Sequence, residues 1–253
     1  MSSATSLIYH PSVTHYLKFV STTVGRDKLL RTIQYFSRFY AWYLLRTNGL
    51  QTAVASYGAL KTQLGLTRKL LRIGKNVEHF KAAATISDTK GLDPVIKYLA
   101  VGRQLGYAGY LSFDALTVPD AVGLRKSTAT QRLQREAYRF WAAGLICSVV
   151  SGVYSLAGLR AQQKRLDRKD GESAVAGKRI EKYARILSQK SSMYANDYFR
   201  ERAAINLQLI SDLADLTVPA TAIGLVSFDD GLVGLAGTLS SLIGVYTQWK
   251  KTA

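Results

Sequence analysis

Residues 140–159 read Phe-Trp-Ala-Ala-Gly-Leu-Ile-Cys-Ser-Val-Val-Ser-Gly-Val-Tyr-Ser-Leu-Ala-Gly-Leu and carry no formal charge. At about 1.5 Å per residue, this run spans about 30 Å, which is the thickness of the hydrocarbon core of a bilayer. Basic residues flank both ends, and Tyr138, Trp141 and Tyr154 lie at depths typical of a membrane interface. The pattern predicts a membrane span, with a buried core helix as the alternative.

A second uncharged run covers residues 231–249, between two aspartates and two lysines. Because basic residues favour the cytosolic side of a membrane, this asymmetry predicts a cytosolic C-terminus. Two weaker apolar stretches, at about 104–124 and about 203–228, each contain aspartates and a proline. They are expected to form spans, half-spans or surface hairpins.

The two strong runs belong to an internal repeat. Asp114-Ala-Leu-Thr-Val-Pro119 recurs as Ala214-Asp-Leu-Thr-Val-Pro219, and Gly152-Val-Tyr154 recurs as Gly244-Val-Tyr246 in the same order. We therefore expect a duplicated unit, at about 98–160 and about 200–250, in which a weakly apolar segment precedes a strong span. Small residues recur at every fourth position of both spans, a spacing that permits close helix contact in lipid. The expected contact residues are Gly144, Ser148, Gly152, Ala236, Ser240 and Gly244.

Carboxylates within the weaker stretches are candidate functional groups. Charged side chains at membrane depth are costly and usually serve a function, so Asp114, Asp212 and Asp215 could line a path for ions or solutes. The alternative is that they lie at the interface or pair with a nearby cation such as Arg103 or Arg202.

Residues 66–80 are predicted to form one amphipathic helix. Their apolar side chains follow the spacing four, three, four, three, and basic side chains occupy the flank and the opposite face. Such a helix can lie in an anionic membrane surface or pack its stripe on a protein core. The expected membrane-inserting residues are Leu66, Leu70, Ile73, Val77 and Phe80, and the expected anionic-lipid-binding residues are Arg68, Lys69, Arg72 and Lys75.

Charge and composition narrow the class of partner. The 253-residue chain has 34 Lys and Arg against 17 Asp and Glu, a net charge of +17, which implies nucleic acid or acidic lipid as a partner. The uncharged runs favour a membrane, so no nucleic acid partner is expected. One cysteine and three histidines provide no metal-ligand spacing, and no phosphate-binding glycine loop or catalytic constellation is detectable. We therefore expect a non-enzymatic protein without a metal or cofactor.

These features together predict an all-α integral membrane protein with N-terminal amphipathic helices and a C-terminal duplicated membrane-helix unit. The N-terminal amphipathic region is expected at residues 1–90 and the membrane region with its repeat at residues 91–253.

Several stretches resemble the peroxin-eleven family of peroxisomal membrane proteins. Residues 25–35, Gly-Arg-Asp-Lys-Leu-Leu-Arg-Thr-Ile-Gln-Tyr, are similar to the N-terminal signature of that family. Residues 93–98 and 102–116 look like its fungal branch, and residues 68–80 are similar to its membrane-remodelling helix. The matches lie in order and cover about residues 10–125.

The resemblance implies a location and an activity. It implies an integral protein of the peroxisomal membrane, whose helix at 66–80 inserts into the cytosolic leaflet and elongates peroxisomes before they divide. It also implies homo-oligomers and engagement of the dynamin-related fission machinery. The alternative is a pore-forming channel for small metabolites, lined by Asp114, Asp212 and Asp215.

Overall fold

The computed structural model describes residues 8–176 and 181–253, with side chains described outside residues 166–196. Every regular element within these residues is a helix, as the sequence predicts. The helices are α2 (Pro11–Ser21), α3 (Thr23–Arg46), α4 (Gln51–Leu71), α5 (Lys75–Asp88), α6 (Pro94–Leu116), α7 (Val118–Ala121), α8 (Thr130–Ala176), α9 (Glu181–Ala222) and α10 (Asp230–Thr252).

Aspartate caps explain where two of the helices begin. The carboxylate of Asp93 accepts a hydrogen bond from the backbone N–H of Val95 at 2.8 Å, directly before α6. Asp229 accepts one from Leu232 at 2.8 Å, directly before α10. Each cap satisfies an N–H group that has no partner within its helix.

The prediction of one uninterrupted helix over residues 66–80 is wrong. Helix α4 continues through Gly65 to Leu71, and α5 begins at Lys75 after Gly74, whose φ of 80° lies in the left-handed region. Glycine adopts this conformation without the steric cost that a side chain would incur, so the turn falls at Gly74. Gly65 serves instead for close packing, because a Cβ there would lie 2.9 Å from the amide nitrogen of Gln34.

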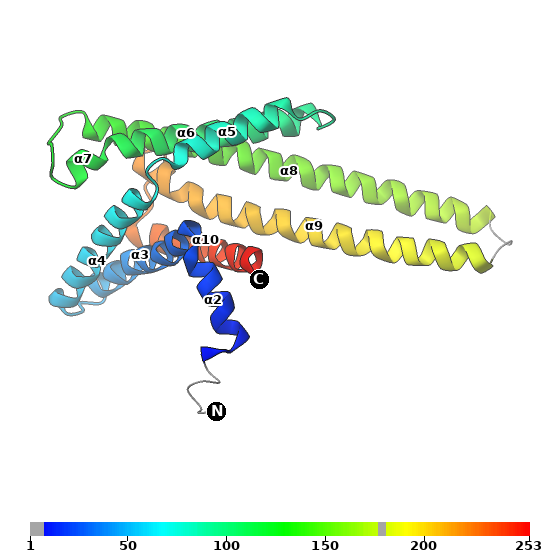
Figure 1. Ribbon diagram of the computed structural model, residues 1–253, viewed down its shortest axis with the longest axis horizontal. Coiled ribbons are helices and arrows are strands. Elements are labelled where there is room, and N and C mark those ends of the chain that lie inside the picture. Colours follow the sequence, from blue (N-terminus) through cyan, green and yellow to red (C-terminus); the bar gives the residue numbers. More distant parts are fainter. Residues whose placement is uncertain (1–7, 177–180) are drawn as a thin grey trace.

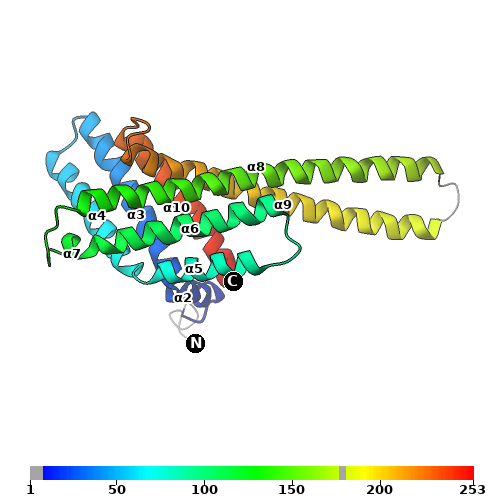
Figure 2. The ribbon, with the colours of Figure 1, turned by 90° about the horizontal axis from the view of Figure 1, so that it is seen from above.

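The helices pack in two groups that α9 connects. Figures 1 and 2 show α5, α6 and α8 side by side in one group, and α3, α4 and α10 together in the other. Helix α9 packs on α8 and meets α10 near its own C-terminal end. The N-terminal helices therefore contact the region predicted as a separate unit, since α3 packs on α10 and α5 packs on α6.

The repeated Leu-Thr-Val-Pro motifs lie near the C-terminal ends of two helices, but only the first interrupts its helix, because α6 ends at Leu116 whereas α9 continues through Pro219 to Ala222. The hydroxyl groups of Thr117 and Thr217 each donate a hydrogen bond to the carbonyl three residues earlier, both at 2.7 Å. A glycine with positive φ follows each motif, Gly123 at 79° and Gly224 at 80°. The two copies thus share the threonine hydrogen bond and the glycine that follows, and the duplicated unit stays a prediction.

One helix among the described residues is long and apolar enough to cross a membrane, and it lies within Thr130–Arg165 of α8. This segment contains the first predicted span. The second predicted span forms most of α10, which does not reach the same apolarity. Its glycine, serine and threonine residues lower its hydropathy, and several of them face α3 instead of the surface.

The interior combines apolar side chains such as Leu145 and Val233 with several charged ones, and many large apolar side chains are exposed. The buried set includes Asp27, Arg31, Arg68, Asp114, Asp212 and Asp215. The exposed set includes Leu232, Leu235, Leu239, Leu242 and Tyr246, which form a continuous stripe along α10. Charged side chains are rarely buried unless they are paired, and large exposed apolar patches mark interaction sites.

Candidate membrane-contacting site

An exposed apolar surface lies at the junction between α4 and α5. Leu70 is 44% exposed, Ile73 57%, Val77 64% and Phe80 49%, while Leu66 is partly buried. Leu70 lies in the last turn of α4, Ile73 in the turn and the other two on α5. Four of the five residues expected to enter a membrane are thus available on the surface, on two helices that meet at Gly74.

The first cation of this segment, Arg68, faces the protein interior and is only 6% exposed. Its Nε donates a hydrogen bond to Asp27 Oδ1 at 2.9 Å, and its Nη1 donates to Gln34 Oε1 at 2.6 Å, so both partners lie on α3. Burial opposes ionisation of Asp27, but the charges of Arg68 and Arg72 outweigh it and hold the pKa of that carboxyl below its usual value. Arg68 therefore joins α4 to α3.

Lys69 and Arg72 bind a single carboxylate on α6. Lys69 Nζ lies 3.0 Å from Asp114 Oδ1, and Arg72 Nη2 lies 3.1 Å from Asp114 Oδ2. Arg72 Nη1 also donates to the hydroxyl of Tyr110 at 2.8 Å. Ion pairs and hydrogen bonds within the protein therefore occupy three of the four cations expected to bind anionic lipid. The fourth, Lys75, lines an internal cavity.

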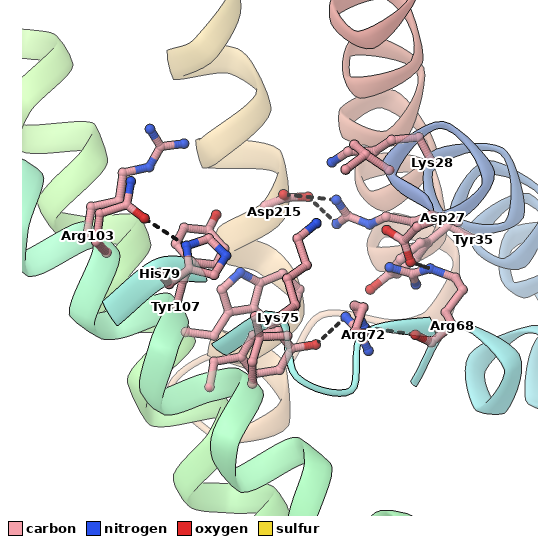
Figure 3. Close-up of a pocket in the computed structure, with 16 residues that line it drawn as sticks. Asp27, Lys28, Tyr35, Arg68, Arg72, Lys75, His79, Arg103, Tyr107 and Asp215 are labelled. Carbon is pink, nitrogen blue, oxygen red and sulfur yellow. Dashed lines mark hydrogen bonds and ion pairs between the residues drawn. The ribbon is translucent and has the colours of Figure 1, made fainter. Parts of the chain in front are cut away.

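The two aspartates of α9 are also buried, with different partners. Asp215 accepts two hydrogen bonds from the guanidinium of Arg31 on α3, one of them at 3.2 Å (Figure 3). Asp212 accepts hydrogen bonds from the Ser148 hydroxyl on α8 and from the amide of Gln208 at 2.8 Å. Among the described side chains, neither aspartate forms an ion pair with Arg103 or Arg202, the cations named from the sequence. Asp215 pairs with Arg31 of the N-terminal region, and Asp212 has the neutral partners Ser148 and Gln208.

The small residues predicted on α8 lie at contacts with two different helices. A Cβ on Gly106 of α6 would lie 2.5 Å from the Cα of Gly144, so the two helices cross where neither residue has a side chain. Ser148 donates to Asp212 on α9, and a Cβ on Gly152 would lie 2.6 Å from the Leu209 side chain of the same helix.

The small residues of α10 meet α3. Ser240 is buried, Ala236 is partly buried, and a Cβ on Gly244 would lie 2.8 Å from the side chain of Lys28. Helix α10 approaches α3 most closely at three glycines that are not among the small residues predicted from the every-fourth-position pattern. Gly231, Gly234 and Gly237 lie against Trp42, Phe39 and Tyr35, respectively. The signal that identifies them is a spacing of three in a helix whose other face is leucine-rich.

Sequence reasoning also missed Asp27 and Arg31 as functional partners, although both lie in the stretch 25–35 that carried the resemblance. The sequence feature that could have identified them is the presence of charged residues on the same helix face as apolar ones, which indicates charges that face the protein interior. Asp27, Arg31 and Tyr35 are four residues apart in turn, which places them on one face of α3. All three are buried.

Buried ion pairs, exposed stripes of large apolar side chains and a long apolar helix are typical of a protein that contacts lipid. Comparison with known proteins agrees with this description. A family model described as peroxisomal biogenesis factor 11 (PEX11) matches residues 13–249. The chain belongs to this family. The PEX11 match includes the α4–α5 junction and every buried ion pair described above.

Curated relatives match along nearly the whole chain. It is 28% identical to peroxisomal membrane protein PMP30B of Candida boidinii over 251 residues, covering 97% of each protein. It is 27% identical to peroxisomal membrane protein PMP27 of Saccharomyces cerevisiae, covering 98% of each. It is 23% identical to peroxisomal membrane protein 11A of Homo sapiens, covering 92% of this chain and 94% of that protein. No solved structure matches the chain.

Proposed function

We propose that this chain is a non-enzymatic protein of the peroxisomal membrane that acts in peroxisome biogenesis by inserting apolar side chains into one leaflet and bending it. Membership of the peroxisomal biogenesis factor 11 family and the names of its relatives support the location and the process. The single observation that supports the mechanism is the exposed apolar surface formed by Leu70, Ile73, Val77 and Phe80.

The energetics favour insertion by this surface. Complete burial of a large apolar side chain contributes about 1.5–3 kcal/mol, and shallow insertion contributes only part of that amount. The cations of the same segment already bind Asp27 and Asp114, so insertion does not require their desolvation. The apolar term therefore dominates the membrane affinity of this segment, and removal of apolar side chains should matter more than removal of charge.

Integral attachment is supported by α8. Only 22% of its most apolar window is buried inside the protein, whereas the core helix of a water-soluble protein is mostly buried. The proposal places α8 across the membrane and the C-terminus, with Lys250 and Lys251, on the cytosolic side. Elongation before division, self-association and engagement of the dynamin-related fission machinery are further parts of this proposal that follow from the family resemblance alone.

A vesicle assay tests the insertion step. The full-length protein is reconstituted with anionic vesicles, and membrane tubules are counted by electron microscopy. Ile73→Glu with Val77→Glu should abolish tubules because both side chains are exposed on the proposed inserting surface. Thr85→Glu, an exposed position on the same helix α5, is the matched control and should leave tubulation intact. Equal tubulation by the double variant and the wild type would reject the mechanism.

A second candidate function is the passage of small solutes, and the arrangement of cavities favours it. Three cavities between the helices share Arg103 as a lining residue, and Asp212 and Asp215 line two of them each. Asp114 is instead held by Lys69 and Arg72 and is 3% exposed. The test is to measure solute conductance in planar bilayers. A conductance of the wild-type protein that changes in the Asp212→Ala variant would support this function.

A further inference from the structure

A cavity of about 310 Å³ lies among the helices, lined by α3, the α4–α5 junction, α6, α8 and α9. Six cationic side chains and two carboxylates line it. The carboxylates belong to Asp27 and Asp215. The wall therefore carries a large excess of positive charge. Half of its residues are buried and the others, including Lys28, Lys75 and Arg103, are partly exposed.

Half of these cations have partners within the protein. Arg31 pairs with Asp215, Arg68 with Asp27, and Arg72 with Asp114 behind the cavity wall. The other three cations are Lys28, Lys75 and Arg103. None of them forms an ion pair with any carboxylate among the residues whose side chains the structure describes.

The three unpaired cations come from three helices and surround the same space. In Figure 3, the amines of Lys28 and Lys75 point toward the middle of the view, near Asp215, and Arg103 stands on the opposite side from Lys28. The Nε of Arg103 is buried and has no hydrogen-bond partner within the described part of the chain. A buried donor without a partner is costly, so a ligand that accepts its hydrogen bond would be stabilised.

Lys28 supports the same conclusion. Burial, together with the neighbouring charge of Arg31, lowers the pKa of this amine to about 8. Its positive charge is therefore held at a cost in the folded protein. An anion placed against the amine would remove that cost.

The chemistry of the wall selects the ligand. A phosphate group offers several oxygen acceptors and up to two negative charges, which matches three cations better than the single charge of a carboxylate. The opposite part of the wall is formed by aromatic and aliphatic side chains, including Tyr35, Tyr110, Leu111 and Trp141. A cavity of this size has room for a phosphate and a small organic group on the same ligand.

We propose that this cavity binds a phosphate ester, with its phosphate against Lys28, Lys75 and Arg103 and its organic part against Tyr110 and Trp141. The phosphate group belongs either to a soluble ester or to the headgroup of a phospholipid. The site does not depend on the exposed apolar surface of the α4–α5 junction, because its side chains lie on the inner side of that segment.

Binding is measured on the full-length protein in nanodiscs of neutral lipid, by calorimetry and by the thermal unfolding midpoint. The probes are glycerol 3-phosphate, inorganic phosphate, acetate and sodium chloride at equal ionic strength. Glycerol 3-phosphate should bind saturably and raise the midpoint beyond the effect of chloride, because a ligand that binds only the folded state stabilises it. A second set of nanodiscs contains phosphatidic acid, and a rise in the midpoint there identifies a lipid headgroup as the source.

Substitutions of the cations that line the cavity test whether the ligand binds there. Lys28→Met and Arg103→Met should each weaken binding at least tenfold. Lys81→Met, at an exposed position of α5, is the matched control and should change it less than twofold. The proposal is overturned if all anions act alike at equal ionic strength, if acetate is as effective as the phosphates, or if Lys28→Met binds as the wild type does. Ile73→Glu with Val77→Glu should retain phosphate binding, so failure of the insertion mechanism and failure of this site are distinguishable.

Discussion

Arg31 and Asp215 form a buried ion pair with two hydrogen bonds between residues 184 positions apart in the chain. The pair links α3, in the N-terminal region, to the second copy of the repeated motif on α9. Lys69 and Arg72 link the N-terminal region to the first copy in the same way, through Asp114. Each copy of the motif thus contributes one aspartate that fastens the N-terminal helices to the rest of the protein.

Removing one partner of the Arg31–Asp215 pair should destabilise the fold strongly. Asp215→Asn leaves a buried guanidinium without its counter-charge, and loss of one member of a buried pair costs about 3–5 kcal/mol. The thermal unfolding midpoint in detergent should fall by several degrees. The double variant Arg31→Met with Asp215→Leu should recover part of that loss, because no unpaired charge remains. A double variant no more stable than the single one would argue against the pair as the cause.

Glycine substitutions should separate tight helix crossings from open positions. Gly106→Ala places a methyl group within 2.5 Å of Gly144, so α6 and α8 must move apart and the unfolding midpoint should fall. Gly158→Ala lies on α8 with no neighbouring atom within 4 Å. It should be neutral or stabilising by about 0.5–1 kcal/mol, because alanine favours a helix more than glycine does. Equal effects of the two variants would contradict the observed crossing.

The all-α class could be predicted from the sequence, because it depends on local periodicity. The choice between Gly65 and Gly74 as the end of α4 could not. Gly65 remains helical because Gln34 of another helix packs against it, whereas Gly74 adopts a positive φ. A sequence shows that glycine is present but does not show which neighbour approaches it.

The orientation of the 66–80 segment was likewise beyond sequence reasoning. Helical spacing separates its apolar face from its cationic face, and a membrane surface or a protein core accounts for that pattern equally well. The cationic face turns inward because Asp27 and Asp114 provide buried carboxylates from 41 and 42 residues away. These partners lie on other helices and follow no spacing in the segment itself.

The inward orientation leads to a prediction about charge. Arg72→Gln should lower the unfolding midpoint but change binding to anionic vesicles less than twofold, since Arg72 contacts Asp114 and Tyr110 inside the protein. Lys81→Gln should do the reverse, because Lys81 is exposed on α5 and a basic residue near an anionic surface adds about 1 kcal/mol to membrane affinity. Co-sedimentation with vesicles and thermal unfolding, measured on both variants, check this expectation. A large loss of vesicle binding by a folded Arg72→Gln protein would show that Arg72 reaches the lipid.

Lys28 gives a prediction in which stability and ligand binding change in opposite directions. The pKa of Lys28 is lowered to about 8 in the folded protein, from 10.5 for an ordinary lysine. Between these values the unfolded chain binds a proton that the folded protein does not, so this residue makes stability rise with pH over that window. Below about pH 8 the buried charge costs at most about 3 kcal/mol. Charged or titratable groups around the amine lie on five other elements as well as on α3. They are Asp27, Arg31, Tyr35, Arg68, Arg72, Lys75, His79, Arg103, Tyr107, Tyr110, Asp212, Asp215 and Lys251.

Lys28→Met removes the buried charge and keeps most of the side-chain volume. The variant without ligand should therefore unfold at a higher temperature than the wild type at pH 7, and the difference should shrink as the pH rises toward 10. The same variant should lose the stabilisation that a phosphate ester provides, because the ammonium that faces the ligand is gone. Thermal unfolding of both proteins between pH 7 and 10, with and without glycerol 3-phosphate, measures both effects. A variant less stable than the wild type at pH 7 would mean that the Lys28 charge has a stabilising partner in the folded protein, and the cavity would then have no need of an anion at this position.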